Sequence, residues 1–116
     1  MRKDMGKMEE AMSETATPAA ACASMNDVRR EIDRVDRALV GLFAERLSYI
    51  ERAAAIKQSR AQVRDDVRVA DIFAKLKASC ASAGFPYAIA EPVFRALVEG
   101  SIVHELAAFD AKGSRF

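Results

Sequence analysis

The chain has 116 residues, of which 51% are hydrophobic, and this is enough for one small domain with a modest core. Its 18 basic and 17 acidic residues leave a formal net charge of +1. A balance of this kind argues against a broad binding surface for nucleic acid or for an anionic membrane. Any function of the arginine and lysine side chains must therefore be local.

The cysteines and the N-terminus favour a cytoplasmic protein. Cys22 and Cys80 lie far apart and match no metal-binding or redox spacing, so we interpret them as free thiols in a reducing compartment. No run approaches the ~20 apolar residues of a membrane span. The N-terminus, MRKDMGKMEEAMSETATPAAACAS, lacks the apolar segment of a signal peptide. We expect residues 1–25 to be a flexible extension.

A long helix is predicted to begin at Asn26 or Asp27, either of which can cap it, and to end near Lys57–Arg60. Its apolar stripe recurs with 3-4 spacing and consists of Ile32, Val35, Leu39, Leu42, Arg46, Tyr49, Ala53 and Ile56. A helix of about 33 residues is ~50 Å long and overhangs a compact domain of this size, whose radius of gyration is ~12 Å. We therefore expect an intertwined homodimer.

Two shorter helices are predicted to follow the polar loop SRAQVRDDVR, and they complete an all-α, three-helix subunit. The first covers Val67 to about Ala83, where Gly84 suits a left-handed cap and Pro86 a stop. The next begins within residues 87–92. The predicted inner faces are Val69, Ile72, Phe73, Leu76 and Cys80, then Val93, Phe94, Leu97, Val98, Ile102, Leu106 and Phe109. The domain is expected to cover 26–110, with a frayed tail at 111–116.

Charged side chains on the apolar stripe point to an anion site. Arg46 and Lys57 are eleven residues apart, so they lie on nearly one line of the helix and ~16 Å apart, a spacing that suits the two ends of one small anion. Arg29 lies ~25 Å before Arg46 and cannot reach that anion within its own subunit. In a crossed dimer, Arg29 of one chain could meet Arg46 and Lys57 of the other.

Ser101 and Glu105 lie on one face of the third helix, one turn apart and beside apolar residues. Each of these residues also has an ordinary structural interpretation. Lys57 could be a solvated lysine, Ser101 and Glu105 rim residues, and Arg46 half of a structural ion pair; His104 is expected on the surface. No catalytic triad, metal cluster or glycine-rich phosphate loop is visible in the sequence. An enzyme of this sequence would work by binding and electrostatics, without a cofactor or metal.

The whole pattern resembles the all-helical (AroQ-type) chorismate mutase family over about residues 26–110. The resemblance rests on VRREIDRVDRALVGLFAERLSYIERAAAIK, VRDDVR and FPYAIAEPVFRALVEGSIVHEL. Within the first stretch, the most specific part is R-x-x-I-D-x-x-D-x-x-L-x-x-L-x-x-x-R with a lysine eleven residues later. The resemblance implies an intertwined homodimer with two shared active sites. The implied reaction is the rearrangement of chorismate, a small dicarboxylate, to prephenate.

The resemblance also implies a role for each site residue. Arg29 would reach into the partner's site, Arg46 would bind a substrate carboxylate, and Lys57 would bind the ether oxygen and a carboxylate. Arg68 would bind substrate near the start of the second helix, with Arg64 in reserve because the register of the loop is open. Asp65 would contact the ring hydroxyl, while Ser101 and Glu105 would contact substrate from the third helix.

Two departures from the family pattern leave alternatives. Many mutases have glutamine where this chain has Glu105, and a carboxyl donates a hydrogen bond only when it is protonated. Val69 stands where many mutases have a glutamate that reaches the substrate hydroxyl, and an apolar residue there is similar to the isochorismate–pyruvate lyase branch of the fold. A third alternative is a non-catalytic helical dimer that binds an anionic metabolite or a protein partner.

Overall fold

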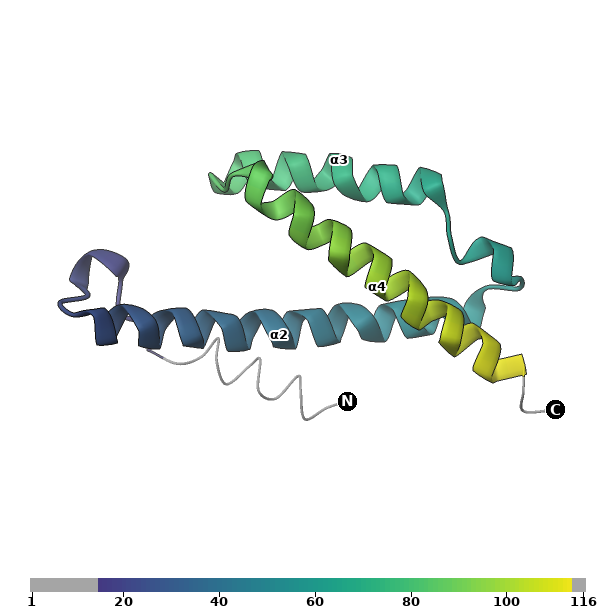
Figure 1. The fold of residues 1–116 in the computed structure, drawn as a ribbon, viewed down its shortest axis with the longest axis horizontal. Helices are drawn as coiled ribbons and strands as arrows, with labels where there is room; N and C mark the ends of the chain where they lie inside the picture. Colours follow the sequence, from purple (N-terminus) through teal and green to yellow (C-terminus); the bar gives the residue numbers. More distant parts are fainter. Residues whose placement is uncertain (1–14, 114–116) are drawn as a thin grey trace. The chain divides into compact units, whose positions relative to one another are not determined.

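The computed structural model of the chain describes residues 15–113 and contains three α-helices and two short 3₁₀ helices (Figure 1). The elements are η1 (Ala19–Ala21), α2 (Met25–Ile56), η2 (Arg60–Gln62), α3 (Asp66–Ala83) and α4 (Tyr87–Gly113). No strand occurs in residues 15–113, and no helix in this range has the length and apolar character that crossing a membrane requires. The prediction of an all-α, three-helix chain with a long first helix is confirmed. The chain divides between Tyr49 and Ile50 into two compact units.

The start of α2 is capped by Ser24, and not by Asn26 or Asp27 as predicted. The Asp27 amide donates to the Ser24 hydroxyl at 3.2 Å, and the Asp27 carboxylate accepts from the Ala23 amide at 3.0 Å. The Ser24 hydroxyl thus satisfies one of the amides that a helix start leaves unpaired, and the Asp27 carboxylate holds the chain just before the helix. The Ala23 amide, followed by Arg30, holds the pKa of Asp27 below its ordinary value. The helix therefore begins at Met25, slightly earlier than expected.

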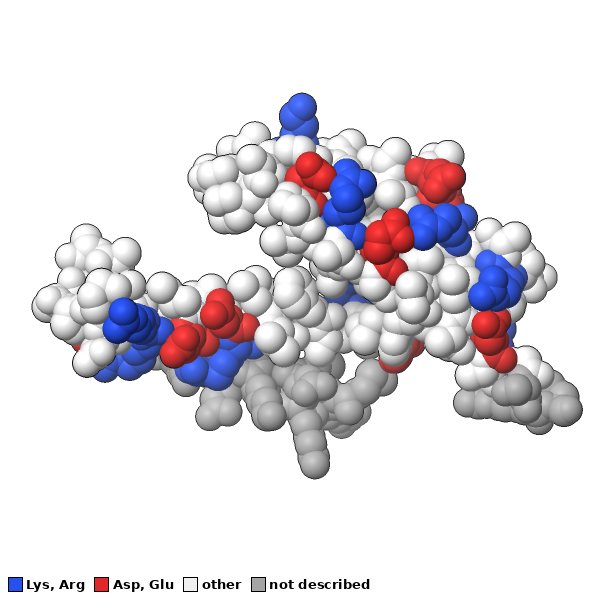
Figure 2. Space-filling view, in the orientation of Figure 1, with Lys and Arg blue, Asp and Glu red and all other residues white. Residues whose placement is uncertain are grey.

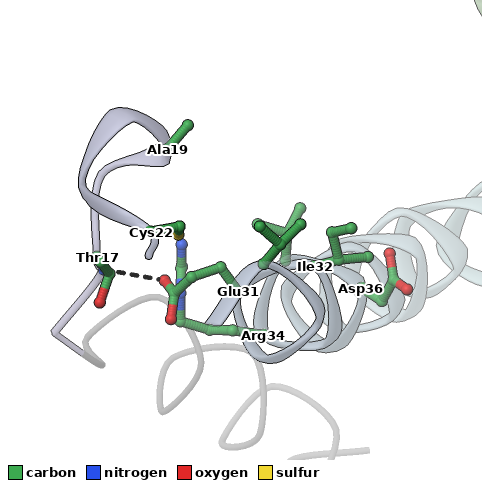
Figure 3. A pocket seen from close by; sticks show the side chains of 9 residues that line it. Thr17, Ala19, Cys22, Glu31, Ile32, Arg34 and Asp36 are labelled. Atoms are coloured by element: carbon green, nitrogen blue, oxygen red, sulfur yellow. Dashed lines mark hydrogen bonds and ion pairs between the residues drawn. The ribbon is translucent and has the colours of Figure 1, made fainter. Parts of the chain in front are cut away.

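The segment before α2 returns to the first turns of that helix (Figure 3). The Thr17 amide donates to a carboxylate oxygen of Glu31 at 3.1 Å, and the Arg34 guanidinium donates to the same oxygen at 3.1 Å. Between the segment and the helix lies a pocket of about 360 Å³, which includes the half-buried Cys22. Thr17 and Cys22 belong to the predicted extension 1–25, of which residues 1–14 lie outside the described residues.

The apolar stripe of α2 is exposed in the first unit. It comprises Ile32, Val35, Leu39, Leu42 and Tyr49, whose exposed fractions run from 43% at Leu39 to 68% at Tyr49. None of these residues belongs to either of the buried hydrophobic clusters. The long helix thus carries a continuous apolar surface that the first unit does not itself bury.

The second unit contains α3 and α4, which pack together and are joined at Gly84 (Figure 1). Gly84 adopts φ 69° and ψ 31°, the left-handed cap that was predicted. One buried cluster contains Leu76, Cys80 and Ala90. The other contains Val63, Val98 and Ile102, with part of the predicted inner faces packed against it. Val93 is the exception among the predicted inner positions, because it is 50% exposed.

The third predicted helix is longer than expected at its C-terminal end. It begins at Tyr87, so Pro92 lies in its second turn, where the missing N–H costs one helical hydrogen bond. The helix continues to Gly113, into the segment 111–116 that the sequence predicts to be frayed. Residues 114–116 lie outside the described residues. Residues 111–113 thus extend α4 by almost one turn, and their side chains belong to the second unit.

Candidate active site

Lys57 is the first residue after α2 and occupies a defined turn. Its amide donates to the carbonyl of Ala53 at 2.9 Å, which continues the helical pattern by one residue. The Gln62 side chain then accepts from the amides of Gln58 and Ser59 at 2.8 and 3.1 Å. This turn replaces helical hydrogen bonds with side-chain bonds, so α2 ends here and presents the Lys57 side chain at its C-terminal end. A cation is favoured there by the helix dipole.

Among the described residues of the second unit, Lys57 and Glu105 form the most buried ion pair. The Lys57 ammonium donates to the Glu105 carboxylate at 2.7 Å, with 27% of the lysine side chain and 5% of the glutamate side chain exposed. A carboxylate this deeply buried is costly unless a charged partner compensates it. Ser101, one turn earlier on the same face of α4, is also buried, and its hydroxyl donates to the Leu97 carbonyl at 2.7 Å.

A pocket of about 450 Å³ adjoins Lys57. It is lined by Lys57, Ala61, Gln62, Arg64, Asp65, Asp66 and Val67. Its volume lies within the range of about 300–1,000 Å³ that is usual for small-molecule sites. Three of the residues singled out from the sequence, Lys57, Arg64 and Asp65, are therefore gathered around one cavity. Of the two arginines that compete for one role, Arg64 lines the pocket and Arg68 does not.

Asp65 and Arg68 have structural roles at the start of α3. Asp65 is the N-cap, and one of its carboxylate oxygens accepts from the Arg68 amide at 3.1 Å. The Arg68 guanidinium donates to Asp71 at 2.6 Å on an exposed face. Hydrogen bonds from Lys75, which has the larger effect, and from Arg68 hold the pKa of Asp71 below its ordinary value. Both predicted substrate contacts are thus engaged by groups at the start of α3.

Arg64 is joined to α4 by two hydrogen bonds to Glu99. Its two terminal nitrogens lie 3.2 and 2.6 Å from the two carboxylate oxygens, the bidentate geometry that arginine favours. Hydrogen bonding to Arg64 lowers the pKa of Glu99, and the same contact raises the pKa of Arg64. Basic and acidic side chains are interspersed over α3 and α4 (Figure 2). Arg64–Glu99 differs from the pairs within one helix because it ties the loop to α4.

The Arg64–Glu99 pair should make part of the stability depend on acid pH. Because the pKa of Glu99 is lowered in the folded chain, its contribution is present above its ordinary value of 4.5 and is lost as the pH falls through the folded value. We expect Glu99→Gln to lower Tm slightly at neutral pH, and the difference from wild type to shrink as the pH falls below 4.5. Thermal unfolding followed by circular dichroism measures this difference.

Glu91→Gln is the matched control, since Glu91 pairs with Arg95 within the same helix and ties no loop to it. A Glu99→Gln difference that persists unchanged at about pH 3, or that Glu91→Gln reproduces, would contradict the assignment.

Arg29 and Arg46 belong to the first unit. Arg29 is exposed and Arg46 is half-buried, both on α2. The remaining predicted site residues, Lys57, Asp65, Arg68, Ser101 and Glu105, lie in the second unit. The contacts described among them lie within the second unit: Lys57 pairs with Glu105, and the Arg68 amide donates to Asp65.

Two contacts near Lys57 were not anticipated. The Lys112 ammonium donates to the carbonyls of Ala54 and Lys57 at 2.7 and 2.6 Å, although Lys112 lies in the predicted tail. His104 is exposed, as expected, but its ring nitrogen Nε2 lies 2.8 Å from a carboxylate oxygen of Glu51. Neither partner is apparent from helical periodicity, because 55 and 53 residues separate Lys112 from Lys57 and His104 from Glu51.

Comparison with protein families decides the classification. The profile of chorismate mutase type II matches residues 28–106, which run from the first turn of α2 to the middle of α4. The chain belongs to the chorismate mutase type II family. Membership supports chorismate mutase activity, an isomerase reaction, and links the chain to aromatic amino acid biosynthesis. The matched range includes all seven predicted site residues. Comparison with curated proteins found no match, and comparison with solved structures found none.

Proposed function

We propose that the chain rearranges chorismate to prephenate in a site built around the paired Lys57 and Glu105. The observation that supports this most directly is the 2.7 Å contact between the two side chains beside a pocket of about 450 Å³. Breaking the enolpyruvyl ether bond places negative charge on the ether oxygen. Preorganised donors at that oxygen, the Lys57 ammonium and a protonated Glu105, would stabilise this charge most where water is excluded.

The proposed arginines serve mainly to fold the substrate. Chorismate is a dianion, and the reaction requires its side chain to lie over the ring. Arg46 and Arg29 would each bind a carboxylate, and Arg68 or Arg64 would add a further cation near α3. When both carboxylates are held in this way, the bound substrate adopts the reactive conformer, which is uncommon in solution. Selecting this conformer can supply a large share of the rate enhancement. Asp65 and Ser101 would contact the ring hydroxyl and the substrate.

The proposed active form is an intertwined homodimer with two shared sites. The exposed apolar stripe of α2 supports it, because a continuous apolar surface of this length marks an interaction site. Arg29 lies seventeen residues before Arg46 on one helix, or about 25 Å away along its axis. In this proposal, each site takes Arg46 and Lys57 from one chain and Arg29 from its partner. The free Cys22 and Cys80 agree with a cytoplasmic location.

Isochorismate–pyruvate lyase activity is the second candidate, and Val69 favours it. Val69 is half-buried and packs against the cluster of Val63, Val98 and Ile102. This position therefore offers the substrate no polar group, and the ring hydroxyl of chorismate would lack that contact. Isochorismate carries its hydroxyl at another ring position, so the lack of a polar group at Val69 would weaken its binding less. The lyase step uses the same cations because it is also pericyclic.

One assay separates the candidates. The purified chain is supplied with chorismate and with isochorismate in separate reactions. Prephenate from chorismate supports the proposed mutase, whereas salicylate plus pyruvate from isochorismate supports the lyase. Turnover of neither substrate would favour a non-catalytic helical dimer that binds an anionic metabolite or a protein partner.

Glu105 should make the reaction faster at acidic pH. A glutamate donates to the ether oxygen only when protonated, and when ionised it holds the Lys57 ammonium at 2.7 Å, in competition with substrate. Both effects lower kcat/KM as pH rises, by up to about tenfold per pH unit for one required proton. Glu105→Gln, which donates at any pH, should flatten the profile measured from initial rates between about pH 5 and 9.

Glu91→Gln serves as the control for this profile, because Glu91 pairs with Arg95 in the first turns of α4 and does not line the pocket. A flat profile in the wild-type chain would exclude the proposed role of Glu105.

A further inference from the structure

The C-terminal end of α2 has no local cap. The last turn of a helix leaves its carbonyl groups without helical donors, and those carbonyls carry the negative end of the helix dipole. The last turn of α2, Ala53 to Ile56, contains no basic residue, and the chain continues with Lys57 and not with a glycine. Donors for this end of the helix must therefore come from elsewhere in the chain.

Lys112 of α4 supplies these donors. Its ammonium donates to the carbonyls of Ala54 at 2.7 Å and of Lys57 at 2.6 Å, and lies 3.4 Å from that of Ala55. An ammonium has three hydrogens to donate, so one side chain reaches several carbonyls at this end of the helix. The Lys112 ammonium also lies 4.3 Å from the centre of the Phe109 ring, a cation–π contact that favours this position.

Lys57 is thereby held by α4 at both its side chain and its main chain. Glu105 binds the Lys57 ammonium, and Lys112 binds the Lys57 carbonyl. Glu105 and Lys112 are seven residues apart, which places them on one face of α4 and about 10 Å apart along it. The two contacts fix both ends of Lys57 against the same face of one helix.

We propose that Lys112 is a positioning residue that sets the place of the Lys57 ammonium for catalysis. The inference rests on the proposed function, in which Lys57 binds the ether oxygen. Without Lys112, the last turn of α2 would fray and the Lys57 main chain would shift. A misplacement of about 1 Å can cost up to about 100-fold in rate, and this loss appears in the transition state, where the ether oxygen becomes charged.

Lys112→Met tests the proposal, because it keeps an aliphatic stem over Phe109 and removes the ammonium. We expect kcat for chorismate to fall about ten- to 100-fold with KM changed less than about threefold. Lys112→Arg, which retains a cation with several donors, should recover most of kcat. Lys77→Met, which removes an exposed lysine of α3, should leave both parameters unchanged. An unchanged kcat in Lys112→Met, or a loss explained wholly by unfolding at the assay temperature, would overturn the proposal.

Amide hydrogen exchange provides a readout that does not depend on turnover. In Lys112→Met, the amides of Lys57 and Gln58 should exchange faster than in wild type, since the turn that protects them loses its anchor. Exchange equal to that of wild type and of Lys77→Met would overturn the role of Lys112 even if kcat had fallen. A wild-type chain that turns over no chorismate would instead refute the proposed function, while exchange would still decide whether Lys112 holds Lys57.

Discussion

Replacing Arg46 by leucine is expected to remove chorismate turnover and to preserve the fold. In the proposed site, Arg46 binds one of the two substrate carboxylates. Loss of one preorganised charged donor typically lowers the rate by about 10²–10³-fold. The substitution should not destabilise the chain, because Leu39 and Leu42 already form the apolar stripe of α2 on the same face and a leucine extends it.

Steady-state kinetics with chorismate and thermal unfolding of the same preparation measure the two expectations together. Arg52→Leu is the matched control, since Arg52 is an exposed arginine of α2 outside the stripe, and it should retain wild-type kcat/KM. An Arg46→Leu chain that unfolds, or whose Tm falls by more than about 10 °C, would show that Arg46 is mainly structural. Full activity in a folded Arg46→Leu chain would remove Arg46 from the site.

Helical periodicity was sufficient to predict the three helices, since their apolar positions recur at 3-4 spacing and few residues interrupt them. The predicted ends agree with the structure where a local signal exists, as at Gly84, whose left-handed conformation ends α3. The predicted ends differ from the observed ends where several neighbouring residues could each cap the helix. Ser24, Asn26 and Asp27 can all cap a helix, and only the hydrogen bond from the Asp27 amide shows that Ser24 does so.

Tertiary contacts account for what periodicity could not predict. Val63 lies in a mostly polar segment, so the sequence indicates a loop. Yet Val63 is only 4% exposed, in a cluster with Val98 and Ile102. Lys112 lies near the end of the chain among small and polar residues, and its partners are backbone carbonyls, which carry no sequence signal. The carbonyl oxygens of all residues are alike, and only the course of the chain selects which of them a lysine reaches.

The partners of the ion pairs between helices also could not be predicted from helical periodicity. The sequence singles out Lys57 and Glu105 separately, by their positions at a helix end and on a helix face, and 48 residues separate them. The family resemblance, which carries information from many chains, is what predicts that they share a site. The structure adds a fact that neither the sequence nor the family resemblance contains. Lys57, Arg64 and Arg68 each face a carboxylate of their own chain, so in the proposed site substrate would exchange with those carboxylates.

Mixed dimers should recover activity from two inactive chains. In the proposed dimer, each site combines Lys57 of one chain with Arg29 of its partner. We expect Lys57→Met and Arg29→Ala each to lower kcat/KM by at least about 100-fold as homodimers. When the two chains are unfolded together and refolded, about half of the dimers contain one of each. Each such dimer has one intact site and one doubly substituted site, so the mixture should recover about a quarter of the wild-type activity.

The matched control mixes Lys57→Met with Arg46→Leu. In the proposed dimer, one chain supplies both Lys57 and Arg46 to a given site. Every site of this mixed dimer therefore lacks one of the two residues, and no activity should return. Recovery in this control but not in the first mixture would mean that Arg46 and Lys57 act across the dimer. Recovery in neither mixture, with mixed dimers demonstrated by mass spectrometry, would mean that each chain builds its own site. The apolar stripe of α2 would then serve assembly alone. The activity that Arg29→Ala loses would then reflect a structural effect and not a contact across the dimer, because Arg29 lies about 25 Å from Arg46 on the same helix.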